Sequence, residues 1–144
     1  MIDIRPARTS DLSAFLEAAW DDVEQEHFGY RPDWAPVSLA FDAWVNDRRV
    51  GALLGEIITG VATVRQLVVS PAWRSTVGIG RALLETFENA AWDQGCHKVT
   101  LRTYADSRAE AFYRRRGYVP EARLRQDLGG IDWVILSKWP LSTP

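Results

Sequence analysis

The sequence predicts an α/β fold: a mixed, mostly antiparallel central sheet with a βαβ unit and helices on both faces. Three observations lead to this fold class. Apolar runs separated by tight turns between residues 43 and 69 are typical of an antiparallel meander. The run 61–69 is followed by a helical pattern over 78–94 and an alternating run over 98–104, which predicts two parallel strands joined by a helix. A final pair of apolar runs flanks Leu128-Gly129-Gly130 and predicts a closing hairpin.

The first part of the chain is expected to form a short strand at residues 2–5, one helix, and a loop at 28–36. Thr9, Ser10 and Asp11 are residue types that cap helix N-termini. The apolar residues that predict the helix itself recur at helical spacing: Leu12, Phe15, Leu16, Ala19 and Trp20. Strands are then expected at 43–46, 50–58 and 61–69.

The strand-to-helix connection that follows is the most informative stretch of the chain. An apolar run ends at Pro71, and Gly78-Ile79-Gly80 opens the helix. The first N–H groups of a helix lack internal partners, and the helix dipole adds positive charge there. Glycine also allows an anion to approach the backbone closely. The stretch therefore predicts a diphosphate site, although a purely structural turn would use the same glycines.

Two common phosphate-binding motifs do not fit this connection. A nucleotide-triphosphate loop requires a lysine after its last glycine, and none follows Gly80. A dinucleotide-binding turn requires a third glycine, where this chain has Leu83. Further along, residues 107–116 predict another helix, capped by Asp106 or Ser107, before the hairpin strands at 118–125 and 131–138.

Composition limits the classes of protein to consider. A length of 144 residues suits one domain, and a net charge of −2 argues against a general nucleic-acid binder. No apolar run approaches the roughly 18 residues of a membrane helix, and the first residues contain no apolar signal region. The single cysteine, Cys96, is expected in the core and cannot form an internal disulfide, so a cytoplasmic location is expected. Two histidines make a histidine-based metal site unexpected.

Two segments carry a family resemblance. VSPAWRSTVGIGRALL, ending at Leu84, resembles the acetyl-CoA-binding segment of the GNAT family of N-acetyltransferases. DSRAEAFYRRRGY at 106–118 resembles that family's N-x-x-A-x-x-F-Y-x-x-x-G-F segment, and both ends of the chain resemble its first and last strands. The resemblance therefore spans nearly the whole chain. It departs at Ser75, where Arg or Gln is usual, and at Asp106, which replaces an asparagine.

The resemblance implies the acyl-CoA N-acyltransferase fold in one acetyltransferase domain over residues 1–144. It implies an enzyme that moves an acetyl group from acetyl-CoA to a primary amine by direct transfer, without a metal. Two central strands would splay apart beside a bulge, and their backbone would bind the pantetheine arm. The residues expected to bind the cofactor are Leu67, Val68, Val69, Arg74, Ser75, Thr76, Val77, Gly78, Ile79, Gly80, Arg81, Asp106, Ala109, Phe112 and Tyr113.

The resemblance also assigns catalytic and acceptor residues. Tyr113 occupies the general-acid position, where a phenol with a pKa near 10 could protonate the leaving thiolate; simple packing beside Phe112 is the alternative. Glu56 is the named candidate for the general base. Gln66, Glu24 and His27 are further candidates for this base. The acceptor site is expected to use residues from the first helix and the loop after it: Glu24, His27, Tyr30 and Trp34.

Two other functions remain open. Ser75 and Asp106 are compatible with a non-catalytic acyl-CoA-binding module that acts as a sensor or partner. A protein lysine or N-terminal acetyltransferase is the other alternative. The expected partner is a small-molecule or peptide amine, with no nucleic acid and no membrane, and a homodimer is compatible with the seven tryptophans.

Overall fold

The computed structural model describes residues 1–74 and 78–141, and these residues form two compact units. The first unit is Met1–Trp34 and the second is Ala35–Pro144. A single domain over residues 1–144 stays a prediction.

The first unit consists of one helix, α1 (Thr9–Phe28), and flanking segments without regular structure. The helix ends at Gly29, whose φ of 77° favours glycine and whose N–H donates to the carbonyl of Gln25 at 2.9 Å. The indole Nε1 of Trp34 donates to the Glu24 carboxylate at 2.6 Å, which fastens the following loop to the last turns of the helix.

Two predictions for this unit are wrong. The N-cap of α1 is Arg8, without a side-chain cap, so none of Thr9, Ser10 and Asp11 has that role. Asp11 lies instead in the first turn, where its charge complements the helix dipole. Residues 2–5 do not form a strand. A strand requires a neighbour to pair its backbone groups, and no ladder among the described residues includes this segment.

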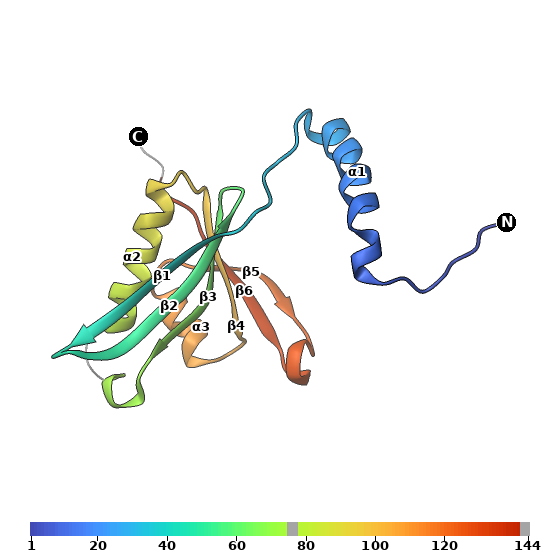
Figure 1. Cartoon of the computed structure of the whole chain (residues 1–144). Coiled ribbons are helices and arrows are strands. Elements are labelled where there is room, and N and C mark those ends of the chain that lie inside the picture. The colour runs from blue at the N-terminus through green and yellow to red at the C-terminus, as the bar shows by residue number, and fades with distance from the viewer. Residues whose placement is uncertain (75–77, 142–144) are drawn as a thin grey trace. The chain divides into compact units, whose positions relative to one another are not determined.

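The second unit is a six-stranded sheet of order β1-β2-β3-β4-β6-β5 with two helices (Figure 1). Among the described strands, β3 and β4 form the one parallel pair, and the other neighbours are antiparallel. The predicted α/β class, with a mixed, mostly antiparallel sheet and a βαβ unit, is therefore confirmed, whereas helices on both faces stay a prediction. The elements are β1 (Val37–Val45), β2 (Arg48–Ile58), β3 (Val61–Val69), α2 (Ile79–Asp93), β4 (Lys98–Tyr104), α3 (Arg108–Arg114), β5 (Val119–Leu124) and β6 (Trp133–Lys138).

The first strand, β1, begins six residues earlier than the predicted strand at 43–46. Leu39 and Phe41 alternate along it and pack against the core. Pro32 and Pro36 made a loop the expected structure just before this segment, so the alternation was not interpreted as part of a strand. The turn that follows lies at Asn46-Asp47, with φ values of 47° and 61°, so Asn46 belongs to the turn and not to the strand predicted at 43–46. Positive φ at both central residues is the geometry of a tight hairpin turn.

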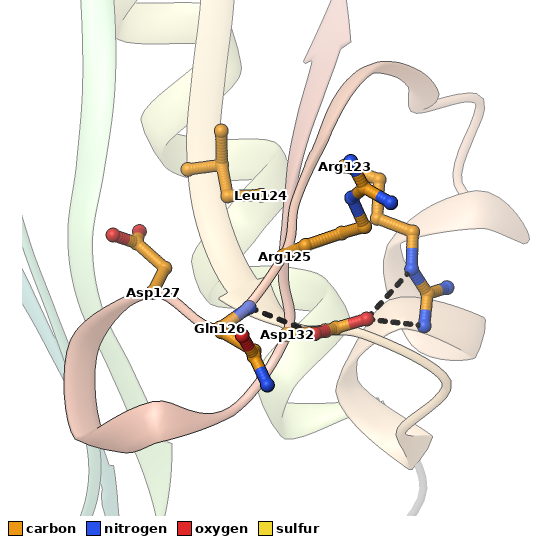
Figure 2. Close-up of a pocket in the computed structure, with 6 residues that line it drawn as sticks. All are labelled: Arg123, Leu124, Arg125, Gln126, Asp127 and Asp132. Atoms are coloured by element: carbon orange, nitrogen blue, oxygen red, sulfur yellow. Dashed lines mark hydrogen bonds and ion pairs between the residues drawn. The ribbon is translucent and has the colours of Figure 1, made fainter.

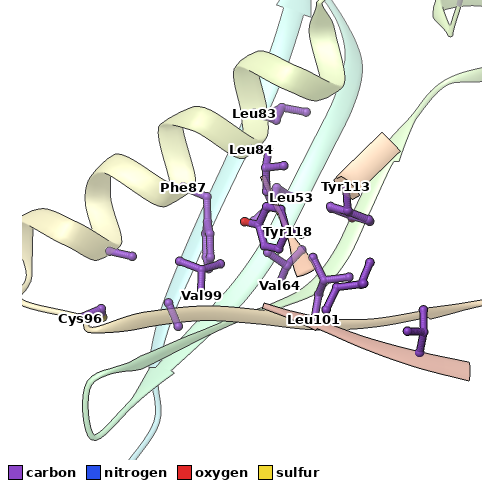
Figure 3. Packing of buried hydrophobic residues seen from close by; sticks show 14 residues of the cluster. Leu53, Val64, Leu83, Leu84, Phe87, Cys96, Val99, Leu101, Tyr113 and Tyr118 are labelled. Atoms are coloured by element: carbon purple, nitrogen blue, oxygen red, sulfur yellow. The ribbon is translucent and has the colours of Figure 1, made fainter. Parts of the chain in front are cut away.

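One face of the sheet carries the hydrophobic core, shown in Figure 3. Residues from α2 and from α3 join the same buried cluster, so both helices pack on this face. Cys96 is 5% exposed, which confirms its predicted place in the core. The cluster is completed by inward-facing residues of four strands, including Leu53, Val64, Val99, Leu101 and Leu136.

Candidate active site

The two parallel strands separate towards their C-terminal ends. β3 pairs with β4 only from Val61–Val64 against Lys98–Leu101, although β3 continues to Val69 and β4 to Tyr104. The register of β2 against β3 shifts beside Arg65, which is the extra residue of a β-bulge. A bulge increases the local twist and bends the strand. The splayed pair and the bulge are the geometry that the family resemblance implies.

The separation opens a cavity of about 330 Å³, called here the β3–β4 cleft. Beyond Val64, β3 is paired on one side only, with β2, so alternate N–H and C=O groups of this stretch face the cleft. Two of the three predicted backbone ligands, Leu67 and Val68, line it, and Val69 does not. The cleft is lined by Val64, Arg65, Gln66, Leu67, Val68, Leu101, Arg102, Thr103, Tyr104, Ala109, Tyr113 and Trp133.

The start of α2 follows β3 and lies next to α3. Gly78 is the N-cap, with a φ of 89° that favours glycine. A Cβ on Gly80 would lie 3.5 Å from the Phe112 ring, so the first turn of α2 approaches α3 closely. Arg74 donates from Nε to the carbonyl of Val69 at 3.3 Å. Three further predicted cofactor residues lie outside the described residues: Ser75, Thr76 and Val77.

Tyr113 projects from α3 into the lining of the cleft. Its side chain is buried, and its ring contacts Phe112 and Tyr118 at centroid distances of 5.2 and 5.6 Å. Burial raises the pKa of Tyr113 to about 12, because the low-dielectric surroundings disfavour the phenolate. The hydroxyl therefore holds its proton at neutral pH. It is a weaker acid than the phenol with a pKa near 10 that the sequence predicts.

The N-terminus of α3 is fixed by a capping arrangement that places Tyr113. The Ser107 hydroxyl accepts the N–H of Glu110 at 3.1 Å, so Ser107 is the cap, one of the two predicted candidates. The Glu110 carboxylate accepts the N–H of Asp106 at 2.9 Å. Asp106 has a φ of 58°, and its carboxylate accepts from Arg123 at 2.9 Å. This ion pair lowers the pKa of Asp106, which is not among the residues that line the cleft.

Glu56 is held by the residue of the bulge. Arg65 donates to its carboxylate from Nε at 2.9 Å and from a second guanidinium nitrogen. Arg65 lines the cleft and Glu56 does not. To act as the general base, the Glu56 carboxylate would have to accept a proton while it is paired with the Arg65 guanidinium. That role stays a prediction.

The four predicted acceptor residues lie together within the first unit. Glu24 is buried, accepts from Trp34, and has the guanidinium of Arg31 3.5 Å from its other oxygen. The Phe28 ring links the others, with centroid distances of 4.6 Å to His27, 5.9 Å to Tyr30 and 6.3 Å to Trp34. The sequence predicted this cluster without Phe28 and Arg31.

Sequence reasoning missed the part of the cleft that comes from β6. Trp133 lies opposite Tyr104 because β6 inserts between β4 and β5, and the two rings are 4.8 Å apart. The Trp133 indole donates to the Leu128 carbonyl at 2.8 Å, which joins the ring to the hairpin connection. No local pattern reports strand order, so no signal in the sequence placed Trp133 beside Tyr104.

The hairpin connection itself surrounds an open cavity of about 760 Å³, shown in Figure 2. Two of its charged residues are paired with each other: Asp132 accepts from Arg123 at 2.9 Å, and it also accepts from the backbone N–H of Gln126 at 3.0 Å. The pairing lowers the pKa of Asp132 through the Gln126 N–H and Arg123. We interpret these bonds as fixing the shape of the hairpin next to the cleft.

Stability should fall above about pH 10 because two tyrosines are buried. Desolvation raises the pKa of Tyr113 to about 12, and burial together with the Glu88 carboxylate raises the pKa of Tyr118. Both native values exceed the unfolded value of about 10, so the unfolded chain loses its protons first. Stability present below about pH 10 is therefore lost as the pH rises, by about 3 kcal/mol for Tyr113 up to about pH 12.

Urea unfolding between about pH 8 and 11 measures this loss. A free energy of unfolding that stays constant from about pH 9 to 11 would contradict the burial of both phenols. Tyr118→Phe, which removes the more strongly shifted group, should reduce the slope.

Residues 5–118 match the model of the family described as the acetyltransferase (GNAT) family. A search of the curated proteins found no match. Within residues 1–74 and 78–141, no helix combines the length and apolar character needed to cross a bilayer.

Three solved structures with a similar fold are described as acetyltransferases, each at low sequence identity. One from Bacillus cereus is 17% identical, with a TM-score of 0.74 over 96% of this chain and 98% of that chain. The ribosomal-protein-S18-alanine N-acetyltransferase of Escherichia coli is 21% identical, with a TM-score of 0.65 over 97% and 94%. A Bacillus anthracis protein assigned as a streptothricin acetyltransferase, in complex with acetyl coenzyme A, is 16% identical, with a TM-score of 0.65 over 74% and 64%.

Proposed function

Since the chain belongs to the GNAT acetyltransferase family, we propose that it is an N-acetyltransferase that moves the acetyl group of acetyl-CoA directly to a primary amine. The observation that carries this proposal is the separation of β3 from β4 beyond Val64 and Leu101. The opening lies towards the C-terminal ends of two parallel strands and is lined by Ala109 and Tyr113 of α3. It supplies unpaired backbone groups, a cavity, and a buried phenol in one place.

The backbone of β3 would bind the thioester substrate. Those N–H and C=O groups of the stretch Leu67–Val69 that point away from β2 would pair with the amides of the pantetheine arm, as a neighbouring strand would. An N–H of this stretch would also donate to the thioester oxygen and stabilise the charge that develops on it. Gly78, Ile79, Gly80 and Arg81, at the start of α2, would hold the diphosphate, because their N–H groups lack helical partners. Contacts from residues 74–77 stay predictions.

The reaction conserves charge and atoms without a further reactant. The neutral amine attacks the thioester carbon, a C–N bond forms, and the C–S bond breaks as the tetrahedral oxyanion collapses. Tyr113 would donate its proton to the departing sulfur, and a base would take the proton that the amine loses. The high pKa of Tyr113 does not prevent this step, because the burial that raises it would also make a thiolate in the same cleft more basic.

The base and the acceptor contacts are the less constrained parts of the proposal. Glu56 is proposed as the base, with its Arg65 ion pair opening when the amine binds. Glu24, His27, Tyr30 and Trp34 are proposed acceptor contacts, because a buried carboxylate among aromatic rings suits a cationic amine. A cytoplasmic location and a homodimer stay proposals as well.

Calorimetry with acetyl-CoA, followed by thiol release in the presence of a broad amine panel, tests the function. Saturable 1:1 binding and amine-dependent thiol release are expected. Ala109→Trp, which would fill the cleft from α3, should abolish binding while the circular dichroism spectrum remains that of the wild type. An absence of acetyl-CoA binding by the wild-type protein would overturn the proposal.

The same assay separates the alternatives. Tight acetyl-CoA binding without thiol release on any amine would indicate the non-catalytic module. Radiolabelled acetyl-CoA added to a cell lysate distinguishes acceptors, because label in protein bands indicates a protein acetyltransferase and label in small molecules indicates a small amine.

A further inference from the structure

A third cavity lies between α2, the end of α3 and the end of β6, apart from the β3–β4 cleft. It has a volume of about 440 Å³ and shares none of its lining residues with the cleft. We call it the α2–α3 recess. Its charged lining residues are Arg81, Glu85, Glu88, Arg115, Arg116 and Lys138.

The two carboxylates of the recess are already committed to partners. Glu85 accepts from Arg81 Nε at 2.7 Å. Glu88 is buried and accepts from the Tyr118 hydroxyl at 2.7 Å and from Lys138 Nζ at 3.1 Å. With four cations against two carboxylates, the recess keeps an excess of two positive charges, carried at Arg115 and Arg116.

Those two arginines lack an acidic partner among the described residues. Arg116 places its guanidinium 3.8 Å from the centroid of the Phe112 ring and donates from Nη1 to the Phe112 carbonyl at 2.9 Å. Its Nε is buried and has no hydrogen-bond partner. Burial and the nearby charges of Arg115 and Arg81 lower the pKa of Arg116, so the like charges lie close enough to repel one another. A buried unpaired donor within such a cluster is costly unless an anion occupies it.

We propose that the α2–α3 recess binds a phosphate monoester through Arg81, Arg115 and Arg116. Guanidinium groups match phosphate oxygens with paired N–H donors, and a dianion would neutralise the excess charge. Arg81 is the third residue of α2, so the recess adjoins the helix start proposed to hold the diphosphate. The phosphate has two sources: the 3′-phosphate of CoA in the neighbouring cleft, which rests on the proposed function, or a separate phosphorylated molecule.

Binding of CoA and of 3′-dephospho-CoA to Arg115→Gln separates these sources. Arg115 is exposed and pairs with no carboxylate among the described residues, so its replacement should preserve the fold. If the 3′-phosphate occupies the recess, the wild type binds CoA about tenfold more tightly than 3′-dephospho-CoA, and Arg115→Gln removes this difference. Arg108→Gln removes the same charge at the first residue of α3, outside the recess, and should preserve the difference.

Titration of inorganic phosphate into the protein saturated with 3′-dephospho-CoA provides the second arm. Saturable phosphate binding that Arg115→Gln weakens, with equal affinity for the two cofactors, indicates a separate phosphorylated molecule. Equal cofactor affinities together with no saturable phosphate binding would overturn the proposal. Failure of the proposed function looks different: neither cofactor binds, and the phosphate titration on the unliganded protein still reports on the recess.

Discussion

Replacing Tyr113 with phenylalanine is expected to lower kcat by about 10²–10⁴-fold, the usual contribution of a positioned general acid. The ring would remain packed against Phe112 and Tyr118, so the shape of the cleft and the binding of acetyl-CoA should be preserved. The departing sulfur would then leave as a thiolate without a proton donor. Steady-state kinetics on the best amine from the panel, with calorimetric binding of acetyl-CoA, measure the two effects separately.

The matched control for this substitution is Tyr118→Phe. It also removes a buried hydroxyl, but this hydroxyl donates to Glu88 and Tyr118 does not line the cleft. Tyr118→Phe should lower stability and leave kcat near the wild-type value. Because burial raises the pKa of Tyr113 to about 12, the wild-type rate should also show no loss from ionisation of this phenol below about pH 10. A Tyr113→Phe enzyme with wild-type kcat would exclude the acid role.

Phe87→Ala is expected to reduce the free energy of unfolding by about 3–5 kcal/mol, which is typical for a fully buried phenylalanine. Phe87 is 0% exposed and lies in the centre of the cluster between α2 and the sheet (Figure 3). Its ring fits so closely that a Cβ on Gly55 would come within 2.4 Å of it and within 2.6 Å of the Thr63 carbonyl oxygen. Because β2 at Gly55 is packed this closely against its surroundings, it cannot move easily into the space that the Phe87 ring leaves.

Urea unfolding at neutral pH measures this effect. Leu128→Ala is the control, because Leu128 is 59% exposed in the hairpin connection and should change the free energy by less than about 0.5 kcal/mol. A change below about 1 kcal/mol for Phe87→Ala would mean that the core packs differently. The position also bears on function, since α2 holds both the start of the proposed diphosphate site and this ring.

Sequence patterns predicted the helices and strands whose periodicity is visible within a single segment. The run 61–69, the helix after Gly78 and the strand 98–104 have clear periodicities, and the structure places them within a residue of the predicted bounds. The strand at 2–5, the early start of β1 and the position of β6 between β4 and β5 depend on which distant segment supplies backbone partners. Such pairing leaves no periodic mark in one segment, so these features could not be predicted.

The residues of the candidate site also fall into those that a local motif predicted and those whose contacts depend on distant segments. Tyr113 and Ala109 could be predicted because residues 106–118 resemble a family motif, and both residues line the cleft. Asp106 was expected at the cofactor, and it pairs with Arg123 from β5, seventeen residues away. Glu56 was expected to be available, and it pairs with Arg65 across the bulge. Long-range ion pairs of this kind follow from tertiary packing.

The short β3–β4 ladder has a mechanical consequence. With backbone pairing limited to Val61–Val64 against Lys98–Leu101, the sheet consists of two three-stranded halves joined along a short seam. Any extended molecule with amide groups that enters the gap lengthens this seam and resists shear between the halves. Occupancy of the gap would then set the stiffness of the whole sheet, and the empty and filled proteins would differ most in how readily the two halves twist against each other.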